Sequence, residues 1–197
     1  MVVPPTALPH MIDKKAIRAE LRRRRRAHVA ALDGAACQRA AEAVATRLEA
    51  EMRRARCVAG YVALGGEFPI HAALARAASL GVATALPVAT ARDAAMHFAP
   101  WRPGDALKAG WAGLAQPDSE TAVTPDLILA PLVGFDRELR RIGQGAGFYD
   151  RYFADSPDAR RIGIAWACQE MDAIPADPWD VPLHAIVTEH EWIGPKS

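Results

Sequence analysis

A glycine-rich segment late in the chain carries the clearest chemical signal. Three glycines alternate there with other residues, at Gly143, Gly145 and Gly147. Glycines allow successive backbone N–H groups to point into one concavity, and a helix that begins after them would add the positive end of its dipole. Arg140 and Arg141 would place cationic charge beside that concavity. The segment therefore predicts an anion site, although the bare glycine spacing fits a plain turn between a strand and a helix equally well.

The two commonest glycine loops do not match this segment. A dinucleotide-binding GxGxxG loop follows an early strand, and an acidic residue comes after the next strand. Here the spacing is GxGxG and the position is late in the chain. A Walker A loop needs Gly-Lys followed by Ser or Thr, which this segment lacks. Phosphate binding here would therefore depend on a less common loop.

The residues around the glycines resemble the signature of one family. Residues 130–136 (APLVGFD) and 141–151 (RIGQGAGFYDR) resemble the signature of the 5-formyltetrahydrofolate cyclo-ligases, which are also called methenyltetrahydrofolate synthetases. Further segments agree with that family in the same order, so the resemblance spans nearly the whole chain; they are residues 14–18, 61–67 and 163–180. Three positions depart from the pattern: Leu139 replaces a frequent glycine, Trp179 a frequent histidine, and Ala146 a frequent lysine or glycine.

The resemblance implies an ATP-dependent reaction. Members of the family close the N5-formyl group of 5-formyltetrahydrofolate onto N10, which gives 5,10-methenyltetrahydrofolate, ADP and phosphate. ATP would be the co-substrate and Mg²⁺ the cofactor, because this oxygen-preferring cation normally accompanies ATP. Both substrates are small molecules, so we expect neither nucleic acid nor a membrane as a partner.

The resemblance also assigns roles to particular residues. ATP would be bound by two cations of the first helix and by the glycine loop, which are Lys14, Arg18, Arg141, Ile142, Gly143, Gln144, Gly145, Ala146, Gly147, Phe148 and Tyr149. Arg141 and Tyr149 would be catalytic. The folate would contact Val62, Glu67 and Tyr149, and Mg²⁺ would be held by Asp150, with Asp180 as a second candidate.

Each assignment competes with an ordinary structural interpretation. Judged by residue type alone, Lys14 and Arg18 are more often part of a solvated helix face, and only their position in the family pattern favours ATP. Glu67 would more commonly be an exposed loop acid, and Val62 a plain core residue. The arginine run at residues 22–26 is more often a solvated helix surface than a nucleic-acid site.

The elements that would position these residues alternate between helices and buried strands. Helices are predicted at residues 14–31 with Asp13 as N-cap, at 35–54, at 70–80, and after the glycines. Strands are predicted at 57–63, 83–87, 96–99, 126–133, 161–166 and 185–188, and a long loop at 100–125. Uninterrupted apolar strands are typical of a parallel sheet covered on both faces. We therefore expect an α/β fold with three α/β/α layers and a mostly parallel sheet. The family resemblance implies a likeness to the sugar-phosphate isomerase and CoA transferase fold.

Length and composition limit the remaining possibilities. The 197 residues, 51% of them hydrophobic and 24% charged, suit one globular domain over residues 13–197 after a loose extension over 1–12. A formal net charge of +1 provides no long-range attraction to a polyanion. Three isolated cysteines fit neither a disulfide framework nor a zinc site, which favours a cytoplasmic location. No apolar run is long enough for a membrane helix, and we expect a monomer, with a dimer as the alternative.

Two other classes of function stay open at this point. A sugar-phosphate isomerase or CoA-transferase-like enzyme on a related fold would bind a phosphate ester at the glycine loop without ATP. Such an enzyme would not need Lys14, Arg18 or Asp150. A nucleic-acid-binding or regulatory protein would instead use the arginine-rich helix, and its glycine loop would be merely structural.

Overall fold

A mostly parallel sheet forms the centre of the protein. The computed structural model describes residues 13–175, 177 and 179–195, so the predicted extension at residues 1–12 lies outside the described residues. The main sheet has seven strands in the order β11-β10-β9-β6-β1-β2-β3. From edge to edge they are Trp192–Ile193, Ala185–Val187, Arg160–Ile164, Leu127–Pro131, Cys57–Ala59, Ala83–Val88 and His97–Pro100. The inner five strands are parallel and both edge strands are antiparallel, which confirms the predicted sheet type.

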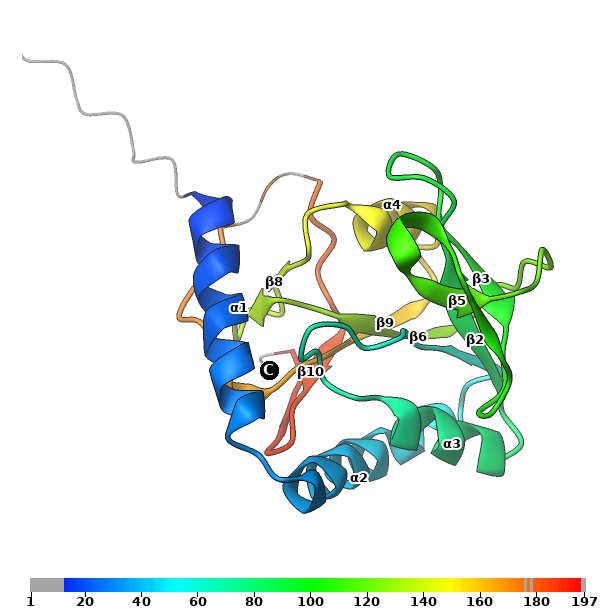
Figure 1. Cartoon of the computed structure of the whole chain (residues 1–197), viewed down its shortest axis with the longest axis horizontal. Coiled ribbons are helices and arrows are strands. Elements are labelled where there is room, and N and C mark those ends of the chain that lie inside the picture. Colours follow the sequence, from blue (N-terminus) through cyan, green and yellow to red (C-terminus); the bar gives the residue numbers. More distant parts are fainter. Residues whose placement is uncertain (1–12, 176, 178, 196–197) are drawn as a thin grey trace, which may run out of the picture.

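Helices cover both faces of this sheet. The described part of the chain contains four α-helices, α1 (Lys14–Ala30), α2 (Gly34–Met52), α3 (His71–Ser79) and α4 (Phe148–Asp155). In Figure 1, α2 and α3 lie together below the sheet, α4 lies above it, and α1 stands at one side of the molecule. None of the helices described is long and apolar enough to cross a membrane.

The first two helices begin at aspartate caps. The side chain of Asp13 accepts a hydrogen bond from Lys15 N, and the side chain of Asp33 accepts one from Ala36 N. The Asp13 cap is confirmed, and each of α1, α2 and α3 begins and ends within two residues of its predicted bounds. The predicted helix after the glycines is α4, which begins directly after Gly147.

The side chains of β6 explain why its sequence is apolar throughout. Leu127 and Leu129 belong to the core shared with α2 and α3, whereas Ile128 and Ala130 belong to the core shared with α4. Successive residues of a strand point to opposite faces, so a strand covered on both faces needs apolar residues at every position. The uninterrupted apolar run of this strand therefore predicted its place in the middle of the sheet correctly.

The predicted strand at residues 57–63 is wrong in its second half. Strand β1 ends at Ala59. Beyond it the chain enters a closed loop, in which the hydroxyl of Tyr61 donates a hydrogen bond to the carbonyl oxygen of Phe68 at 2.8 Å. Gly65 and Gly66 within that loop have positive φ angles of 54° and 83°, a backbone conformation that favours glycine. The apolar residues after Ala59 are thus buried by the loop, not by strand pairing.

The predicted loop at residues 100–125 contains regular structure. Strands β4 (Leu107–Ala109) and β5 (Ala115–Pro117) pair in an antiparallel hairpin around the 3₁₀ turn Trp111–Gly113. All three residues of β4 are exposed, so the alternation that reveals a half-buried strand is missing from the sequence. A second small sheet pairs β7 (Gly134–Phe135) with β8 (Arg141–Ile142) and so sets the start of the glycine loop.

Candidate functional site

Two cavities adjoin at the carboxyl ends of parallel strands, where ligands commonly bind in α/β sheets. The glycine-loop cavity, of about 570 Å³, is lined by residues 141–151 with Lys14, Arg18, Asp177 and Asp180. The Glu67 cavity, of about 510 Å³, is lined by Glu67 and by apolar side chains that include Val62, Met96 and Trp111. Five residues line both cavities and form their common wall: Pro131, Gln144, Ala146, Phe148 and Tyr149.

The glycine loop leads directly into the N-terminus of α4. Gly147 caps this helix at φ 70°, and Gly145 has φ 103°, so both positions favour glycine. A Cβ atom on Gly145 would also lie 3.7 Å from the guanidinium of Arg18. Gly143 has no such restriction, and its carbonyl oxygen accepts a hydrogen bond from Arg18 Nε at 3.0 Å. The loop thus combines a helix N-terminus with a cation, the arrangement predicted for an anion site.

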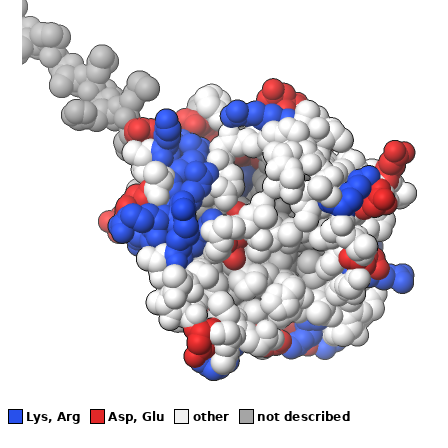
Figure 2. Space-filling model, viewed as in Figure 1, with Lys and Arg blue, Asp and Glu red and all other residues white. Residues whose placement is uncertain are grey.

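A row of cations on α1 runs past both cavities. Lys14, Arg18, Arg22 and Arg26 are spaced four residues apart, which places them along one side of a helix. Lys14 and Arg18 line the glycine-loop cavity, whereas Arg22 and Arg26 line the Glu67 cavity. Figure 2 shows this helix as the largest blue area on the visible face, beside the central hollow.

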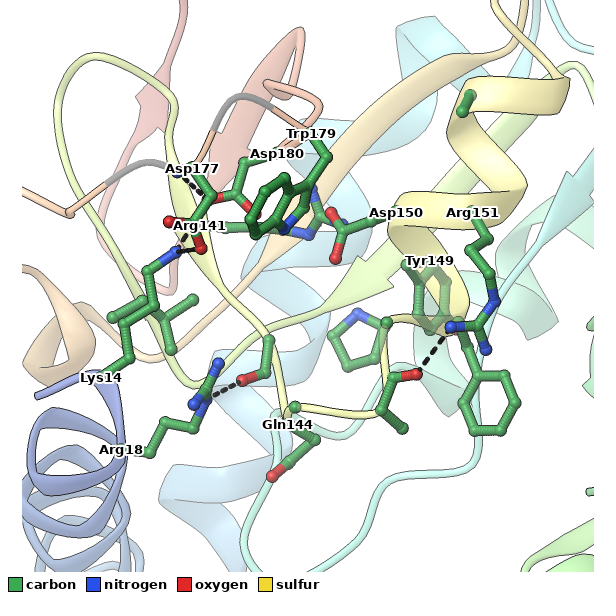
Figure 3. A pocket seen from close by; sticks show the side chains of 18 residues that line it. Lys14, Arg18, Arg141, Gln144, Tyr149, Asp150, Arg151, Asp177, Trp179 and Asp180 are labelled. Atoms are coloured by element: carbon green, nitrogen blue, oxygen red, sulfur yellow. Dashed lines mark hydrogen bonds and ion pairs between the residues drawn. The ribbon is translucent and has the colours of Figure 1, made fainter. Parts of the chain in front are cut away.

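Lys14 is held by two carboxylates from the far end of the chain. Its Nζ lies 2.6 Å from Asp177 Oδ2 and 3.0 Å from Asp180 Oδ2 (Figure 3). Burial lowers the pKa of Lys14, but the hydrogen bonds to these aspartates outweigh burial, so the pKa is raised overall. Asp180, the second candidate metal ligand, is therefore in the predicted cavity with Lys14 as its partner.

Arg141 and Asp150 form the second ion pair of the glycine-loop cavity. Arg141 Nη2 donates to Asp150 Oδ1, and its Nη1 donates to the carbonyl oxygen of Val181 at 2.7 Å. The guanidinium also lies 4.8 Å from the ring centroid of Phe153. These contacts hold the Arg141 side chain in one orientation although it is almost completely buried. Among the described residues, no group of three or more His, Cys, Asp or Glu side chains forms a metal cluster.

Glu67 is the polar anchor of the second cavity. Its Oε1 accepts a hydrogen bond from Gln144 Nε2 at 2.6 Å, and its Oε2 accepts one from Leu64 N at 3.1 Å. Arg25 Nη1 lies 4.0 Å from Oε1. Burial raises the pKa of Glu67, and these three neighbours offset only part of that rise. The ordinary interpretation of Glu67 as an exposed loop acid is therefore wrong, because Glu67 is a buried carboxylate that faces a cavity.

Tyr149 stands between the two cavities with an unsatisfied hydroxyl group. The Oη atom is buried and has no hydrogen-bond partner among the described residues. Burial and the nearby Glu67 raise the pKa of this phenol, while Arg141 opposes the rise, so Tyr149 stays protonated at physiological pH. A buried hydroxyl without a partner is unfavourable, so this group is ready to donate a hydrogen bond to a ligand.

The structure brings all of the residues that were assigned roles in ATP, folate or Mg²⁺ binding to these two cavities. Arg140, which was predicted beside the glycine loop, lines neither cavity and pairs with Asp136 at 2.7 Å. Two contributions were not predicted. Asp177 joins Asp180 at Lys14, and Arg25 is 3% exposed, although the run at residues 22–26 was interpreted as solvated. Arg25 lies one helical turn after the buried Leu21, so the helical spacing could have revealed it. Trp111 also lines the Glu67 cavity, whereas Trp101 lines neither cavity.

Together, fold and site define a class of protein: an α/β protein that joins a phosphate-type glycine loop to an apolar cavity with a carboxylate anchor. Comparison with known proteins identifies the family. Residues 10–189 match the model of the 5-formyltetrahydrofolate cyclo-ligase family, and the chain belongs to that family.

Curated relatives carry the same name. The chain is 35% identical to a 5-formyltetrahydrofolate cyclo-ligase of Mycolicibacterium smegmatis over 144 residues, which cover 68% of this chain and 73% of the relative. It is 29% identical to a probable 5-formyltetrahydrofolate cyclo-ligase of Caenorhabditis elegans, with 91% of this chain and 96% of the relative covered.

Solved structures support the fold. The 5,10-methenyltetrahydrofolate synthetase of Aquifex aeolicus superposes with a TM-score of 0.78 over 93% of each chain, at 24% identity. The enzyme of the same name from Mycoplasma pneumoniae superposes with a TM-score of 0.68, over 90% of this chain and 99% of that one, also at 24% identity. The α/β architecture is therefore that of methenyltetrahydrofolate synthetase structures.

Proposed function

We propose that this protein is a 5-formyltetrahydrofolate cyclo-ligase, which uses ATP to convert 5-formyltetrahydrofolate to 5,10-methenyltetrahydrofolate, ADP and phosphate. Membership of the family and the names of the curated relatives support this activity. The observation that carries the proposal is the common wall at Tyr149, because two substrates that exchange a phosphoryl group must meet. A sugar-phosphate isomerase or a CoA transferase would leave the family match unexplained.

The chemistry requires activation of the formyl oxygen. An amide-like oxygen is a poor leaving group, so this oxygen first attacks the γ-phosphorus of ATP, and ADP leaves. The N10 lone pair then adds to the formyl carbon, N10 loses its proton to solvent, and the C–O bond breaks with release of phosphate. Positioning and charge neutralisation provide most of the catalysis of such a transfer.

The glycine-loop cavity is the proposed ATP site. Lys14, Arg18 and the backbone N–H groups of the glycine loop would bind phosphate oxygens. Arg141 is fixed by Val181 and Phe153, so it would meet the transferred phosphoryl group without reorganisation. The free hydroxyl of Tyr149 would donate to the oxygen that is passed between the substrates.

Mg²⁺ fits the donor atoms of this cavity. Asp150 and Asp180 offer the carboxylate oxygens that this ion prefers, and Mg²⁺ in nucleotide sites commonly takes one or two carboxylates together with phosphates. When bound, the ion would neutralise charge on the β- and γ-phosphates. Asp150 and Asp180 now pair with Arg141 and Lys14, so arrival of Mg-ATP would exchange carboxylate partners for phosphate partners.

The Glu67 cavity is the proposed folate site. A buried carboxylate can accept paired hydrogen bonds from the amino and ring N–H groups of a pterin. Val62, Trp111 and the ring of Tyr149 would enclose the apolar faces of the pterin. The three cysteines are free thiols, which supports the proposed cytoplasmic location. A monomer and a fold related to the sugar-phosphate isomerases and CoA transferases remain part of the proposal.

A direct assay tests the function. The purified protein is incubated with 5-formyltetrahydrofolate, Mg²⁺ and ATP, and the near-ultraviolet absorbance of the methenyl product is followed. We expect the absorbance to rise only when ATP is present. A folded protein that gives no ATP-dependent signal would contradict the proposal.

A further inference from the structure

The glycine loop is tied to the proposed folate anchor before any ligand is present. Gln144, the residue between Gly143 and Gly145, donates from Nε2 to Glu67 Oε1 at 2.6 Å. These residues lie 77 positions apart in sequence. The Gln144 side chain therefore bridges the two cavities through the acceptor that a pterin would use.

Arg22 fixes the other side of the Gln144 side chain. Its Nη2 donates to Gln144 Oε1 at 2.7 Å and to the backbone carbonyl oxygen of Gln144 at 3.1 Å. Its Nε donates to the same side-chain oxygen at 3.1 Å. Both the amide oxygen and the amide nitrogen of Gln144 are thus occupied, and the side chain cannot turn into the glycine-loop cavity while these bonds last.

A second bond holds the same loop from the other cavity. Arg18 Nε donates to the carbonyl oxygen of Gly143 at 3.0 Å (Figure 3). Arg18 is the cation proposed to bind ATP phosphates, so a nucleotide that recruits Arg18 removes this bond. A pterin that takes Glu67 Oε1 removes the bond from Gln144. Because these two bonds hold adjacent residues of one loop, a loop that is displaced by either ligand gives up both bonds.

We infer that Gln144 is a positioning residue that couples the two cavities, so that each substrate increases the affinity of the protein for the other. The inference rests on the proposed function. The resting loop must be released once, and the free-energy cost falls on whichever ligand binds first. The second ligand then meets a loop that is already released, which is positive coupling and is the same in both directions.

The coupling predicts an unusual effect of mutation. If Gln144 simply contacted a substrate, Gln144→Ala would weaken binding. If Gln144 instead restrains the loop, Gln144→Ala should strengthen binding of either ligand alone by about tenfold, because the hydrogen bond to the charged Glu67 no longer has to be broken. The same change should abolish the extra affinity that one ligand gives to the other.

Calorimetric titration tests the inference. Wild-type protein and Gln144→Ala are titrated with a non-hydrolysable ATP analogue plus Mg²⁺, with 5-formyltetrahydrofolate, and with each ligand after saturation by the other. Gln38→Ala is the matched control, because Gln38 donates to Glu42 on the exposed face of helix α2 in the same type of bond, away from both cavities. Arg22→Ala should act in the same direction as Gln144→Ala, and the double variant should add little, since Arg22 works through Gln144.

Each outcome is decisive. We expect about tenfold coupling in the wild type and in Gln38→Ala, and none in Gln144→Ala, whose single-ligand affinities rise. Uncoupled binding in the wild type, retained coupling in Gln144→Ala, or weaker binding of both ligands by that variant would each overturn the inference and leave the proposed function intact. A wild-type protein that binds neither ligand would instead refute the proposed function.

Discussion

Asp150 accepts a hydrogen bond from Arg141, so the proposed magnesium ligand and the proposed phosphate-binding cation neutralise each other. Arg141 retains two other contacts, with Val181 and with the ring of Phe153. Loss of the carboxylate charge should therefore leave the fold and the orientation of Arg141 largely unchanged. The pair makes it possible to remove the metal ligand without destroying the cavity around it.

The first prediction concerns Asp150→Asn. We expect a loss of turnover of about a hundredfold or more, because the variant lacks a charged ligand for Mg²⁺ at the transferred phosphoryl group. Initial rates are measured over a Mg²⁺ titration, and circular dichroism checks the fold. Asp155→Asn is the control, since Asp155 is exposed on the same helix and lines neither cavity. Normal rates in Asp150→Asn would refute the assignment of this carboxylate.

The second prediction concerns Lys14→Met. Removal of the ammonium group leaves Asp177 and Asp180 in the proposed ATP site without their cation. We expect the KM for ATP to rise about tenfold or more, while the KM for folate changes little, because Lys14 lines only the glycine-loop cavity. Steady-state kinetics with each substrate varied in turn measure both constants. Lys15→Met, at an exposed neighbouring position, should behave like the wild type.

The third prediction is a pH dependence that arises from Glu67. Burial raises the pKa of this carboxyl group, so it takes up a proton at a higher pH than an exposed glutamate does. A pterin that donates two hydrogen bonds prefers the ionised form. The kcat/KM for folate should therefore fall as the pH drops toward the raised pKa of Glu67, starting above the usual glutamate range.

Glu67→Gln provides the control for this pH profile. The amide does not titrate, so we expect a lower kcat/KM for folate that stays flat over the same acidic range. The free energy of unfolding should depend on pH in the opposite direction from kcat/KM. A raised pKa in the folded state means that ionisation of Glu67 opposes folding, so its contribution to stability is lost as the pH rises through that pKa. An unchanged acidic limb in Glu67→Gln would assign the titration to another group.

The fourth prediction concerns the buried cation Arg25. Its guanidinium donates to the carbonyl oxygens of Gly65 and Leu132 and faces Glu67. Arg25→Met leaves Glu67 buried without a cation, which should destabilise the protein by about 3 kcal/mol and raise the pKa of Glu67 further. Urea unfolding measures the first effect, and the folate pH profile measures the second. Arg24→Met, on the exposed side of α1, should change neither.

Local patterns predicted most of the fold. The N-cap at Asp13 and the 3.6-residue spacing gave the bounds of α1, and the apolar run that contains Leu127 gave β6, because these elements obey local rules. Exposed β4 carries no such pattern, and Tyr61 is buried by a loop closure that no periodicity describes. Propensity and patterning thus fail where a segment lacks a regular alternation of buried and exposed residues.

The candidate site was predictable only through the resemblance to a family. Glu67 and Lys14 look like ordinary surface residues when they are judged by type, and nothing local connects Lys14 with Asp177. Arg25 is different, because the sequence did contain a local signal for its burial, namely its four-residue spacing from Leu21. The charges of the neighbouring arginines favoured an exposed helix surface instead. Its burial depends on Gly65 and Leu132, which only the folded chain brings near.

The contacts of Lys14 also determine when the site can exist during synthesis. Its partners Asp177 and Asp180 follow 163 and 166 residues later, so α1 leaves the ribosome long before the carboxylates that hold its first turn. Chains that lack the last segment leave Lys14 without these partners. Completion of the glycine-loop cavity is thus a late event of biosynthesis, because it requires Asp177 and Asp180 to reach Lys14.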